Sequence, residues 1–277
     1  MDKVKIDSQL RADVSVVIPC YRCADSIGRA FESIQKQTVL PTEVILVDDA
    51  SDDLTKIKLQ EIIDANPGFA KLIALDKNKG AANARNVGWN SASQPYIALL
   101  DSDDAWHPQK IEIQYNFMKE NPDVSLCGHE LRIVNANASF NWSLGKQTYS
   151  LISKLSILIR NPFCTPSVMF NKNIGFRFNE KKRHVDDHLL WMQIALSNYK
   201  VIRINIPLVA IFKPMYGATG LSAQMWAMEK SELNNYWLLF KENKINFLGC
   251  VTLFVFSYLK FIRRLMLVFL RKKLFAK

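Results

Sequence analysis

Residues 14–21 read VSVVIPCY, and residues 43–53 read EVILVDDASDD. In both stretches a continuous apolar run ends abruptly, as expected of a strand that is buried on both faces. Two further apolar runs follow at 70–75 and 95–100, and stretches with helical spacing separate the four runs, at 24–37, 54–65 and 81–92. This alternation predicts an α/β fold with a Rossmann-like, mainly parallel sheet that is flanked by helices.

The second half of the chain is less regular. Residues 123–134 and 200–212 have the composition of strands, and residues 164–170 (CTPSVMF) that of a short strand. Residues 186–197 (DDHLLWMQIALS) predict an amphipathic helix that begins with two acids. Aspartate at a helix start is also an ordinary capping residue, so this position alone does not establish a function.

Composition and charge divide the chain into two parts. The 277 residues are 49% hydrophobic, which excludes an intrinsically disordered chain. The formal net charge is +10, but residues 241–277 hold nine basic residues and one acid and therefore carry +8 of it. We expect one nearly neutral domain over residues 1–240 and a basic helical tail over residues 241–277.

The five cysteines are sparse and odd in number, which argues against a disulfide framework and is typical of a reducing compartment. Cys20 and Cys23 form a C-x-x-C, for which two small residues at a strand end are the simple interpretation and a redox pair the alternative. The first 13 residues contain no apolar segment, so no secretory signal peptide is expected.

Acidic clusters follow two of the predicted strands. In parallel sheets, ligands bind beyond the carboxyl ends of the strands. Asp101, Asp103 and Asp104 repel one another unless a cation lies among them, and such carboxylates suit Mg²⁺ or Mn²⁺; a solvated loop is the alternative. The acids within 48–53 could bind a ribose or a base, or form a turn before a helix. Neither G-x-G-x-x-G after the first strand nor a P-loop occurs.

Five ordered motifs, taken together, resemble the family 2 glycosyltransferases. The motifs are SVVIPCY (15–21), VILVDDASDD (44–53), NKGAANARNVG (78–88), ALLDSDDAW (98–106) and VDDHLLW (185–191). The resemblance covers about residues 13–222 and implies a GT-A type fold. It also implies an inverting enzyme that uses a nucleotide-diphospho-sugar.

The resemblance implies a role for each matching residue. Those that would bind the nucleotide-sugar are Pro19, Tyr21, Asp48, Asp49, Gly80, Arg85 and Asp101. Within that set, Pro19 and Tyr21 would flank the base, Asp49 would contact it, and Asp48 would support Asp49. The D-x-D signature would hold a divalent metal, Mn²⁺ or Mg²⁺, on Asp103 with help from Asp101 and Asp104.

Asp187 matches the family's catalytic base. The family usually has Glu-Asp before this helix, whereas this chain has Asp186-Asp187, which is shorter by one methylene at position 186. A carboxylate there could take the proton of an acceptor hydroxyl as it attacks the anomeric carbon. The neighbouring His184 and His188 are expected at the surface or as supporting residues, and Trp106 and Trp191 in the core. Residues 219–222 (TGLS) are a looser match to an acceptor-side loop.

The tail has the features of an interfacial helix. Residues 247–259 are uncharged, but thirteen residues are too few to span a bilayer, which takes about 20. The basic residues Lys260, Arg263, Arg264 and Arg271 share one side of the helix that follows, which suits an anionic membrane surface. The alternatives are a helix docked on the domain with its basic side in solvent, and a re-entrant hairpin or partly inserted helix.

These features predict a glycosyltransferase of bacterial surface polysaccharide synthesis, bound peripherally to the cytoplasmic face of the inner membrane. Its acceptor would be a saccharide or a lipid-linked saccharide. The resemblance favours a UDP-sugar as donor and leaves GDP- and dTDP-sugars open. A non-catalytic nucleotide-sugar-binding or scaffold protein is the alternative. The nearly neutral body and the apolar tail argue against a nucleic-acid partner.

Overall fold

The computed structural model describes residues 10–134, 141–212 and 224–275. Within them one nine-stranded sheet has the order β3-β2-β1-β4-β8-β6-β9-β5, and β7 pairs with β9. The first four strands are parallel: β1 (Arg11–Cys20), β2 (Leu40–Asp48), β3 (Ala70–Ala74) and β4 (Tyr96–Leu99). The remaining strands are β5 (Ala105–Trp106), β6 (Val124–Ile133), β7 (Tyr149–Leu151), β8 (Met169–Asn171) and β9 (Lys200–Ile211). This confirms the expected α/β fold and the parallel arrangement of its first four strands, whereas β4 and β6 pair antiparallel with β8, and β5 and β7 pair antiparallel with β9.

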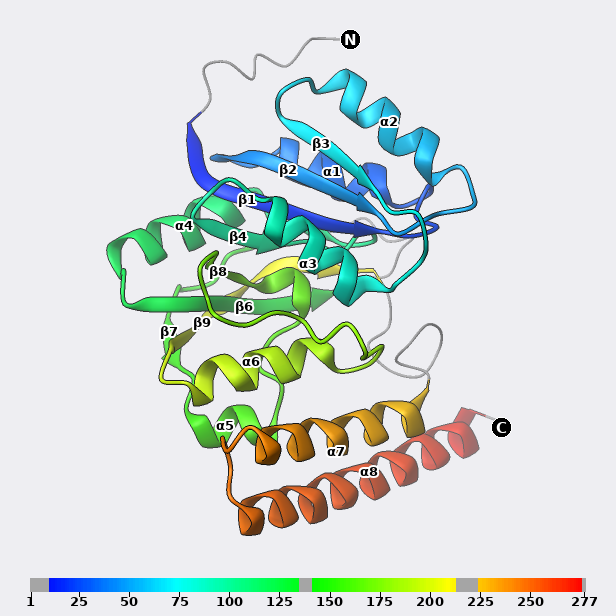
Figure 1. Ribbon diagram of the computed structural model, residues 1–277, viewed down its shortest axis with the longest axis vertical. Helices are drawn as coiled ribbons and strands as arrows, with labels where there is room; N and C mark the ends of the chain where they lie inside the picture. The colour runs from blue at the N-terminus through cyan, green and yellow to red at the C-terminus, as the bar shows by residue number, and fades with distance from the viewer. Residues whose placement is uncertain (1–9, 135–140, 213–223, 276–277) are drawn as a thin grey trace.

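Helices cover both faces of the sheet (Figure 1). One face packs against α1 (Ile27–Gln35), α2 (Thr55–Ala65) and α4 (Lys110–Glu120). The other face carries α3 (Ala81–Ser91), α5 (Lys154–Ile159), α6 (Asp186–Leu196) and α7 (Met225–Lys241). Adjacent strand residues divide between the two cores: Val16 and Ile18 join the first and Val17 joins the second. Strands buried on both faces explain why the apolar runs of the sequence are continuous.

Helix α3 lies unusually close to the sheet. A Cβ atom added at Gly88 would lie 2.3 Å from Cγ1 of Val17 on β1. Since any larger residue would push the helix outward, Gly88 sets the depth of α3 against the strands. That depth matters because α3 also carries Arg85.

One short strand prediction was partly wrong. Of residues 164–170, only Met169 and Phe170 belong to β8, whereas Thr165–Ser167 form a 3₁₀ helix. Pro166 stands at the first turn of this helix, where its missing N–H costs no hydrogen bond. The sequence did not predict α4, α5 or α7.

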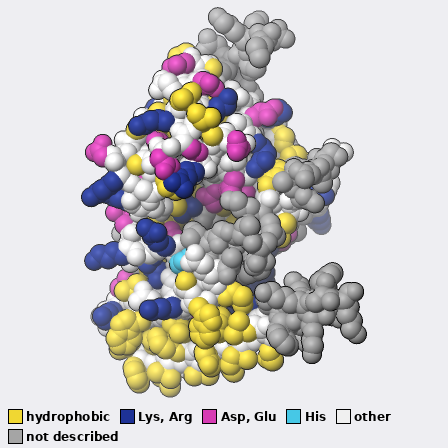
Figure 2. Space-filling view, turned by 90° about the vertical axis from the view of Figure 1, so that its right-hand side faces the viewer, with side chains coloured by type: hydrophobic (Ala, Val, Ile, Leu, Met, Phe, Trp, Pro, Cys, Tyr) yellow, Lys and Arg dark blue, Asp and Glu magenta, His cyan; other side chains and the backbone are white. Residues whose placement is uncertain are grey.

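Helix α8 (Phe247–Phe275) packs along α7 and against α5 at the lower end of the molecule (Figure 1). Cys250, Leu253 and Phe261 are buried on its inner side. Its outer side exposes a run of large apolar residues, and Figure 2 shows hydrophobic side chains gathered at this end. They include Phe247, Leu248, Val251, Val255, Phe256, Leu259 and Met266. Among the described residues, no helix is both long enough and apolar enough to cross a membrane.

Candidate active site

The polar residues that follow the parallel strands meet at one edge of the sheet, as expected. Cys20 at the end of β1 pairs with Asp48 at the end of β2, and Asp48 pairs with Ala74 at the end of β3. Pro19 pairs with Val47 one residue earlier. The segments that carry Tyr21, Asp49 and Lys79 therefore all leave the sheet at the same edge.

Asp49 holds the loop that leads into α3. Its two carboxylate oxygens accept hydrogen bonds from the backbone N–H groups of Lys79 (2.9 Å) and Gly80 (2.7 Å). Gly80 has φ 91° and ψ 165°, a conformation that only glycine adopts readily. The loop can therefore approach Asp49 closely. Asp48 is fully buried, and its Oδ1 accepts from the backbone N–H of Ser51 at 3.2 Å.

Tyr21 follows the last residue of β1 at this edge, and 42% of its surface is exposed. The guanidinium carbon of Arg22 lies 5.3 Å from the centre of its ring, and Asp52 holds Arg22 through two hydrogen bonds of 2.6 Å. The ring of Tyr21 is therefore positioned by a charged neighbour while remaining accessible. An exposed aromatic ring of this kind offers a stacking face to a planar ligand.

The aspartates of 101–104 have different surroundings. Asp101 and Asp103 are partly exposed, whereas Asp104 is buried. Arg85 donates to Asp101 Oδ1 at 2.8 Å, and Arg29 donates to the backbone oxygen of Asp103 at 2.5 Å. The loop that displays these carboxylates is therefore fixed from two sides by arginines.

The carboxylate oxygens at this edge are the ligand type that Mg²⁺ and Mn²⁺ prefer. In residues 10–134, 141–212 and 224–275, no three His, Cys, Asp or Glu side chains gather into a ready-made metal site. Asp101 and Asp103 are both partly exposed at this edge, and Asp101 accepts a hydrogen bond from Arg85. A Mg²⁺ or Mn²⁺ ion that takes most of its ligands from substrate phosphates and water fits this arrangement.

Arg85 links this edge to the second acidic pair. Its NH2 group lies 2.8 Å from Asp101 Oδ1, and its NH1 group lies 3.5 Å from Asp186 Oδ2. The side chain of Arg85 is only 9% exposed. Burial alone would lower its pKa, but the carboxylates of Asp101 and Asp186 outweigh this effect and raise it. Arg85 is therefore a permanent positive charge between two groups of acids that are far apart in the sequence.

The pair Asp186-Asp187 begins α6 after a strained residue. Val185 adopts the left-handed conformation (φ 55°), which is rare for a β-branched residue. The side chain of Asn235 on α7 donates to the carbonyl of Val185 at 2.9 Å and holds this turn. Strain of this kind persists only where the surrounding structure enforces it, which is typical of functional sites.

The two aspartates face different partners. Asp186 lies beside Arg85, and burial raises its pKa to about 6 despite that neighbour. Asp187 accepts from Asn161 at 3.3 Å and Thr165 at 3.4 Å, and it borders a cavity of about 610 Å³. Burial also raises the pKa of Asp187, which makes its carboxylate a better proton acceptor.

Behind Asp187, the sequence predicts His188 at the surface or as a supporting residue and assigns no role to Glu232 or Tyr236. His188 is buried, with Nδ1 3.3 Å from Glu232 and Nε2 2.7 Å from the carbonyl oxygen of Ile157. Burial disfavours the charged imidazole, but Glu232 outweighs this effect and raises the pKa of His188. Burial also opposes ionisation of Glu232, yet His188 and Tyr236 hold its pKa at about 2. The i, i+4 spacing of Glu232 and Tyr236 on α7 was the one available sequence signal.

Several other predictions have clear outcomes. Trp106 and Trp191 are buried, which confirms them as core residues. Cys20 and Cys23 are also buried, and burial raises the pKa of the Cys20 thiol. Residues 219–222 lie outside the described residues.

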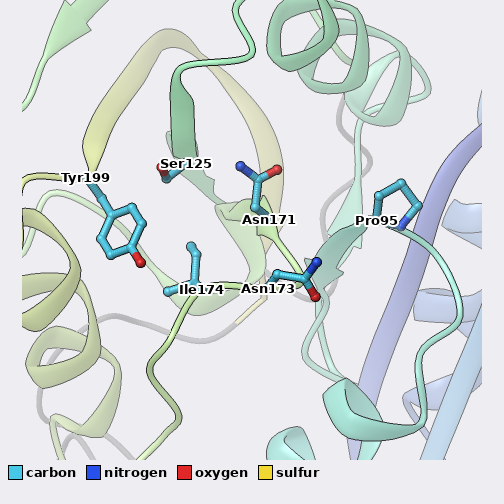
Figure 3. A pocket seen from close by; sticks show the side chains of 6 residues that line it. All are labelled: Pro95, Ser125, Asn171, Asn173, Ile174 and Tyr199. Atoms are coloured by element: carbon cyan, nitrogen blue, oxygen red, sulfur yellow. The ribbon is translucent and has the colours of Figure 1, made fainter.

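A separate cavity of about 290 Å³ lies at the opposite edge of the sheet, beside the start of β4 (Figure 3). Its walls include Pro95, Ser125, Asn171 and Tyr199, and its lining carries no charged side chain. It therefore lacks the acids and bases that the carboxyl edge gathers.

Comparison with known proteins gives a consistent result. The family model described as "Glycosyl transferase family 2" matches residues 15–182. The Escherichia coli protein WfgD, described as a UDP-Glc:alpha-D-GlcNAc-diphosphoundecaprenol beta-1,3-glucosyltransferase, is 32% identical over 197 residues, which cover 67% of this chain and 70% of WfgD. The succinoglycan biosynthesis protein ExoO of Rhizobium meliloti (strain 1021) is 34% identical over 165 residues, which cover 60% of this chain and 44% of ExoO.

Among solved structures, residues 1–349 of S. aureus TarS in complex with UDP-GlcNAc resemble this chain with a TM-score of 0.68. The match covers 87% of this chain and 70% of the TarS chain at 18% sequence identity. At that identity the likeness concerns the fold.

Asp186 should make stability depend on pH. Its carboxyl has a pKa raised from 3.8 to about 6, so ionisation destabilises the folded chain as pH rises through that interval. The Asp186→Asn variant avoids this cost. Because the variant also removes a partner of Arg85, we expect a change with pH rather than a fixed gain: its free energy of unfolding relative to the wild type should rise by about 1–3 kcal/mol between pH 4 and pH 8. Urea titrations at the two pH values measure the effect.

Asp52→Asn is the matched control, because Arg22 lowers the pKa of Asp52. A lowered pKa contributes stability above the unfolded value, so this variant should lose a little stability at pH 8 and none at low pH. A difference in free energy of unfolding between Asp186→Asn and the wild type that does not change with pH would contradict the raised pKa of Asp186.

Proposed function

Because the chain belongs to glycosyl transferase family 2, we propose that it transfers a sugar from a nucleotide-diphospho-sugar to a hydroxyl group of a saccharide acceptor, with inversion at the anomeric carbon. UDP is the proposed nucleotide, since WfgD is described as using UDP-Glc and the TarS structure contains UDP-GlcNAc. A role in bacterial glycan synthesis is supported by the descriptions of WfgD and ExoO.

The contact that carries this proposal is the bridge made by Arg85. It joins Asp101, in the D-x-D motif at the sheet edge, to Asp186, the neighbour of the proposed base Asp187. A transfer enzyme needs its donor site and its base on opposite sides of one reacting carbon. The bridge brings together the two motifs that would form those sides, although 85 residues of sequence separate Asp101 from Asp186.

The proposed reaction is a single displacement. As the acceptor hydroxyl attacks the anomeric carbon, its proton passes to the carboxylate of Asp187 and a new C–O bond forms. The bond from the anomeric carbon to the donor diphosphate breaks, and its electron pair leaves with the nucleoside diphosphate. Asn161 and Thr165 orient Asp187 through its Oδ2 atom, and no covalent intermediate on the chain is required.

The residues at the sheet edge have complementary roles in donor binding. Tyr21 would stack on the base beside Pro19. Asp49, which holds the loop at Gly80, would also contact the base, and Asp48 would support Asp49. A Mg²⁺ or Mn²⁺ ion held by Asp103, with Asp101 and Asp104 nearby, would neutralise the charge that develops on the leaving diphosphate. Arg85 would position Asp101 and add a fixed positive charge nearby.

Replacing Asp187 by Asn should lower kcat about 10²–10⁴-fold, because the amide cannot accept the proton of the acceptor hydroxyl. The affinity for UDP should stay unchanged, since Asp187 lies on the acceptor side. Transfer from UDP-Glc or UDP-GlcNAc and calorimetric titration with UDP provide the two measurements.

Asp64→Asn serves as the control, because Asp64 is an exposed acid on α2. If Asp187→Asn retains full activity, Asp187 is not the base. If the wild type binds UDP but transfers no sugar under any donor and acceptor condition, the alternative of a nucleotide-sugar-binding scaffold is favoured.

Asp103→Asn should remove the effect of metal on donor binding. We expect Mn²⁺ to tighten UDP binding by the wild type, and EDTA to reverse this gain. In Asp103→Asn the gain should fall at least about tenfold, because a metal held by Asp103 would lose a protein ligand. Equal Mn²⁺ dependence in Asp103→Asn and Asp64→Asn would refute the role of Asp103.

We also propose that the outer side of α8 lies on an anionic membrane surface. Leu248, Val255 and Leu259 recur at helical spacing on this side, with exposed fractions of 73%, 57% and 59%. The +8 charge of residues 241–277 adds electrostatic attraction to anionic headgroups, at about 1 kcal/mol for each basic residue near the surface. An apolar stripe flanked by basic residues is typical of helices that lie in the membrane interface.

A variant with Leu248→Glu, Val255→Glu and Leu259→Glu should bind phosphatidylglycerol vesicles at least about tenfold more weakly. It places negative charge on the side of α8 that is proposed to enter the membrane interface. The control is Leu54→Glu with Ile57→Glu, two equally exposed apolar residues at the start of α2. Co-sedimentation with vesicles measures binding, and equal loss in both variants would exclude α8 as the contact.

A further inference from the structure

The cavity beside Asp187 is built by segments from both parts of the chain. Its volume is about 610 Å³, within the range of small-molecule sites. Asp187 and the segment 159–161 form one wall, and α7 and α8 form the other. The charged residues that line it are Arg160, Asp187, Glu229, Glu232, Lys260, Arg263 and Arg264. The basic residues of α8 that the sequence suggested for membrane contact therefore also border the proposed acceptor side.

All three acids in this lining are engaged by neighbours, and Asp187 accepts from Asn161 and Thr165. Glu232 lies against His188 at 3.3 Å and accepts from the hydroxyl of Tyr236 at 2.9 Å. Glu229 accepts from Ser257 on α8 at 2.8 Å. The basic residues of the lining outnumber its acids; they are Arg160, Lys260, Arg263 and Arg264. The excess of positive charge is larger still because His188 offsets the charge of Glu232. The cavity therefore favours an anionic ligand.

Hydrogen bonds connect the basic lining to the segment that contacts Asp187. Lys260 donates to the carbonyl of Ile159 at 2.9 Å, so α8 is fastened to the segment that precedes Arg160. Asn161, the residue after Arg160, donates to Asp187 at 3.3 Å. An anion held by Arg160 would thus lie close to the carboxylate that is proposed to take the acceptor proton.

We propose that this cavity binds the diphosphate of a lipid-linked acceptor, with Arg160, Arg263 and Arg264 as its ligands. Guanidinium groups match phosphate oxygens in geometry and charge. The saccharide on the diphosphate would then present its hydroxyl to Asp187. The lipid would leave the cavity along α8, whose outer side is apolar. This inference rests on the proposed function, since it assigns a substrate to that same site.

Titration calorimetry with geranyl diphosphate tests the cavity on the full chain without vesicles. We expect binding that persists when UDP is saturating. The double variant Arg160→Gln with Arg263→Gln should bind the probe at least about tenfold more weakly, through the loss of charge-assisted hydrogen bonds. Both residues are exposed at the rim, and unchanged UDP binding would show that the variant is folded.

Lys241→Gln is the matched control, because Lys241 is an exposed basic residue of α7 outside the cavity lining. Its affinity for geranyl diphosphate should equal that of the wild type. Equal affinity in the double variant and the wild type, or displacement of the probe by UDP, would overturn the proposal. Failure of geranyl diphosphate to bind the wild type would also overturn it. If in that case the double variant, but not Lys241→Gln, loses binding to phosphatidylglycerol vesicles, the cavity is assigned to a phospholipid headgroup.

Asp187→Asn separates this inference from the proposed function. Because it removes a negative charge from the cavity wall, it should bind geranyl diphosphate as tightly as the wild type or more tightly, while losing transfer. Retained transfer in Asp187→Asn refutes the base and leaves the diphosphate result intact. Lost transfer combined with lost probe binding refutes the diphosphate site.

Discussion

A buried arginine between carboxylates is the constraint on which the site depends. Arg85 is nearly excluded from water, so its charge is tolerable only while acids remain beside it. Asp101 and Asp186 supply that charge from opposite sides. Gly88 lets α3 lie against β1 closely enough for Arg85 to reach both. A small residue one turn further along the helix thus fixes the distance between two acidic motifs.

The same constraint explains the unequal aspartates of α6. Asp186 forms an ion pair with Arg85, whereas Asp187 faces Asn161, Thr165 and the cavity. Two adjacent residues at a helix start can face different partners because the strained turn at Val185 sets the direction in which α6 begins. Burial raises the pKa of both, but only Asp187 is among the residues that line the cavity, which is why we propose it as the base.

The sequence predicted the parts of this arrangement that depend on local patterns. Continuous apolar runs identified the parallel strands, and the residues after them identified the sheet edge at which the polar segments meet. It could not predict that both carboxylate oxygens of Asp49 would accept from the backbone of the 79–80 loop, because no pattern links these segments. The burial of His188 between Glu232 and Ile157 is likewise a property of how α7 packs on α5 and α6. The 3₁₀ helix at Thr165–Ser167 has a strand-like composition that Pro166 overrides.

The basic residues of the C-terminal segment have two possible roles because of the way α8 packs. A helix repeats every 3.6 residues, so one helix can present an apolar side and a basic side at the same level along its axis. Leu248, Val255 and Leu259 point outward, whereas Lys260 and Arg264 border the cavity that reaches Asp187. If the outer side lies on a membrane, the inner side stands where the phosphates of a membrane-bound substrate would emerge from the bilayer. Attachment and acceptor binding would then be two faces of one element, and its positive charge would serve catalysis as well as location.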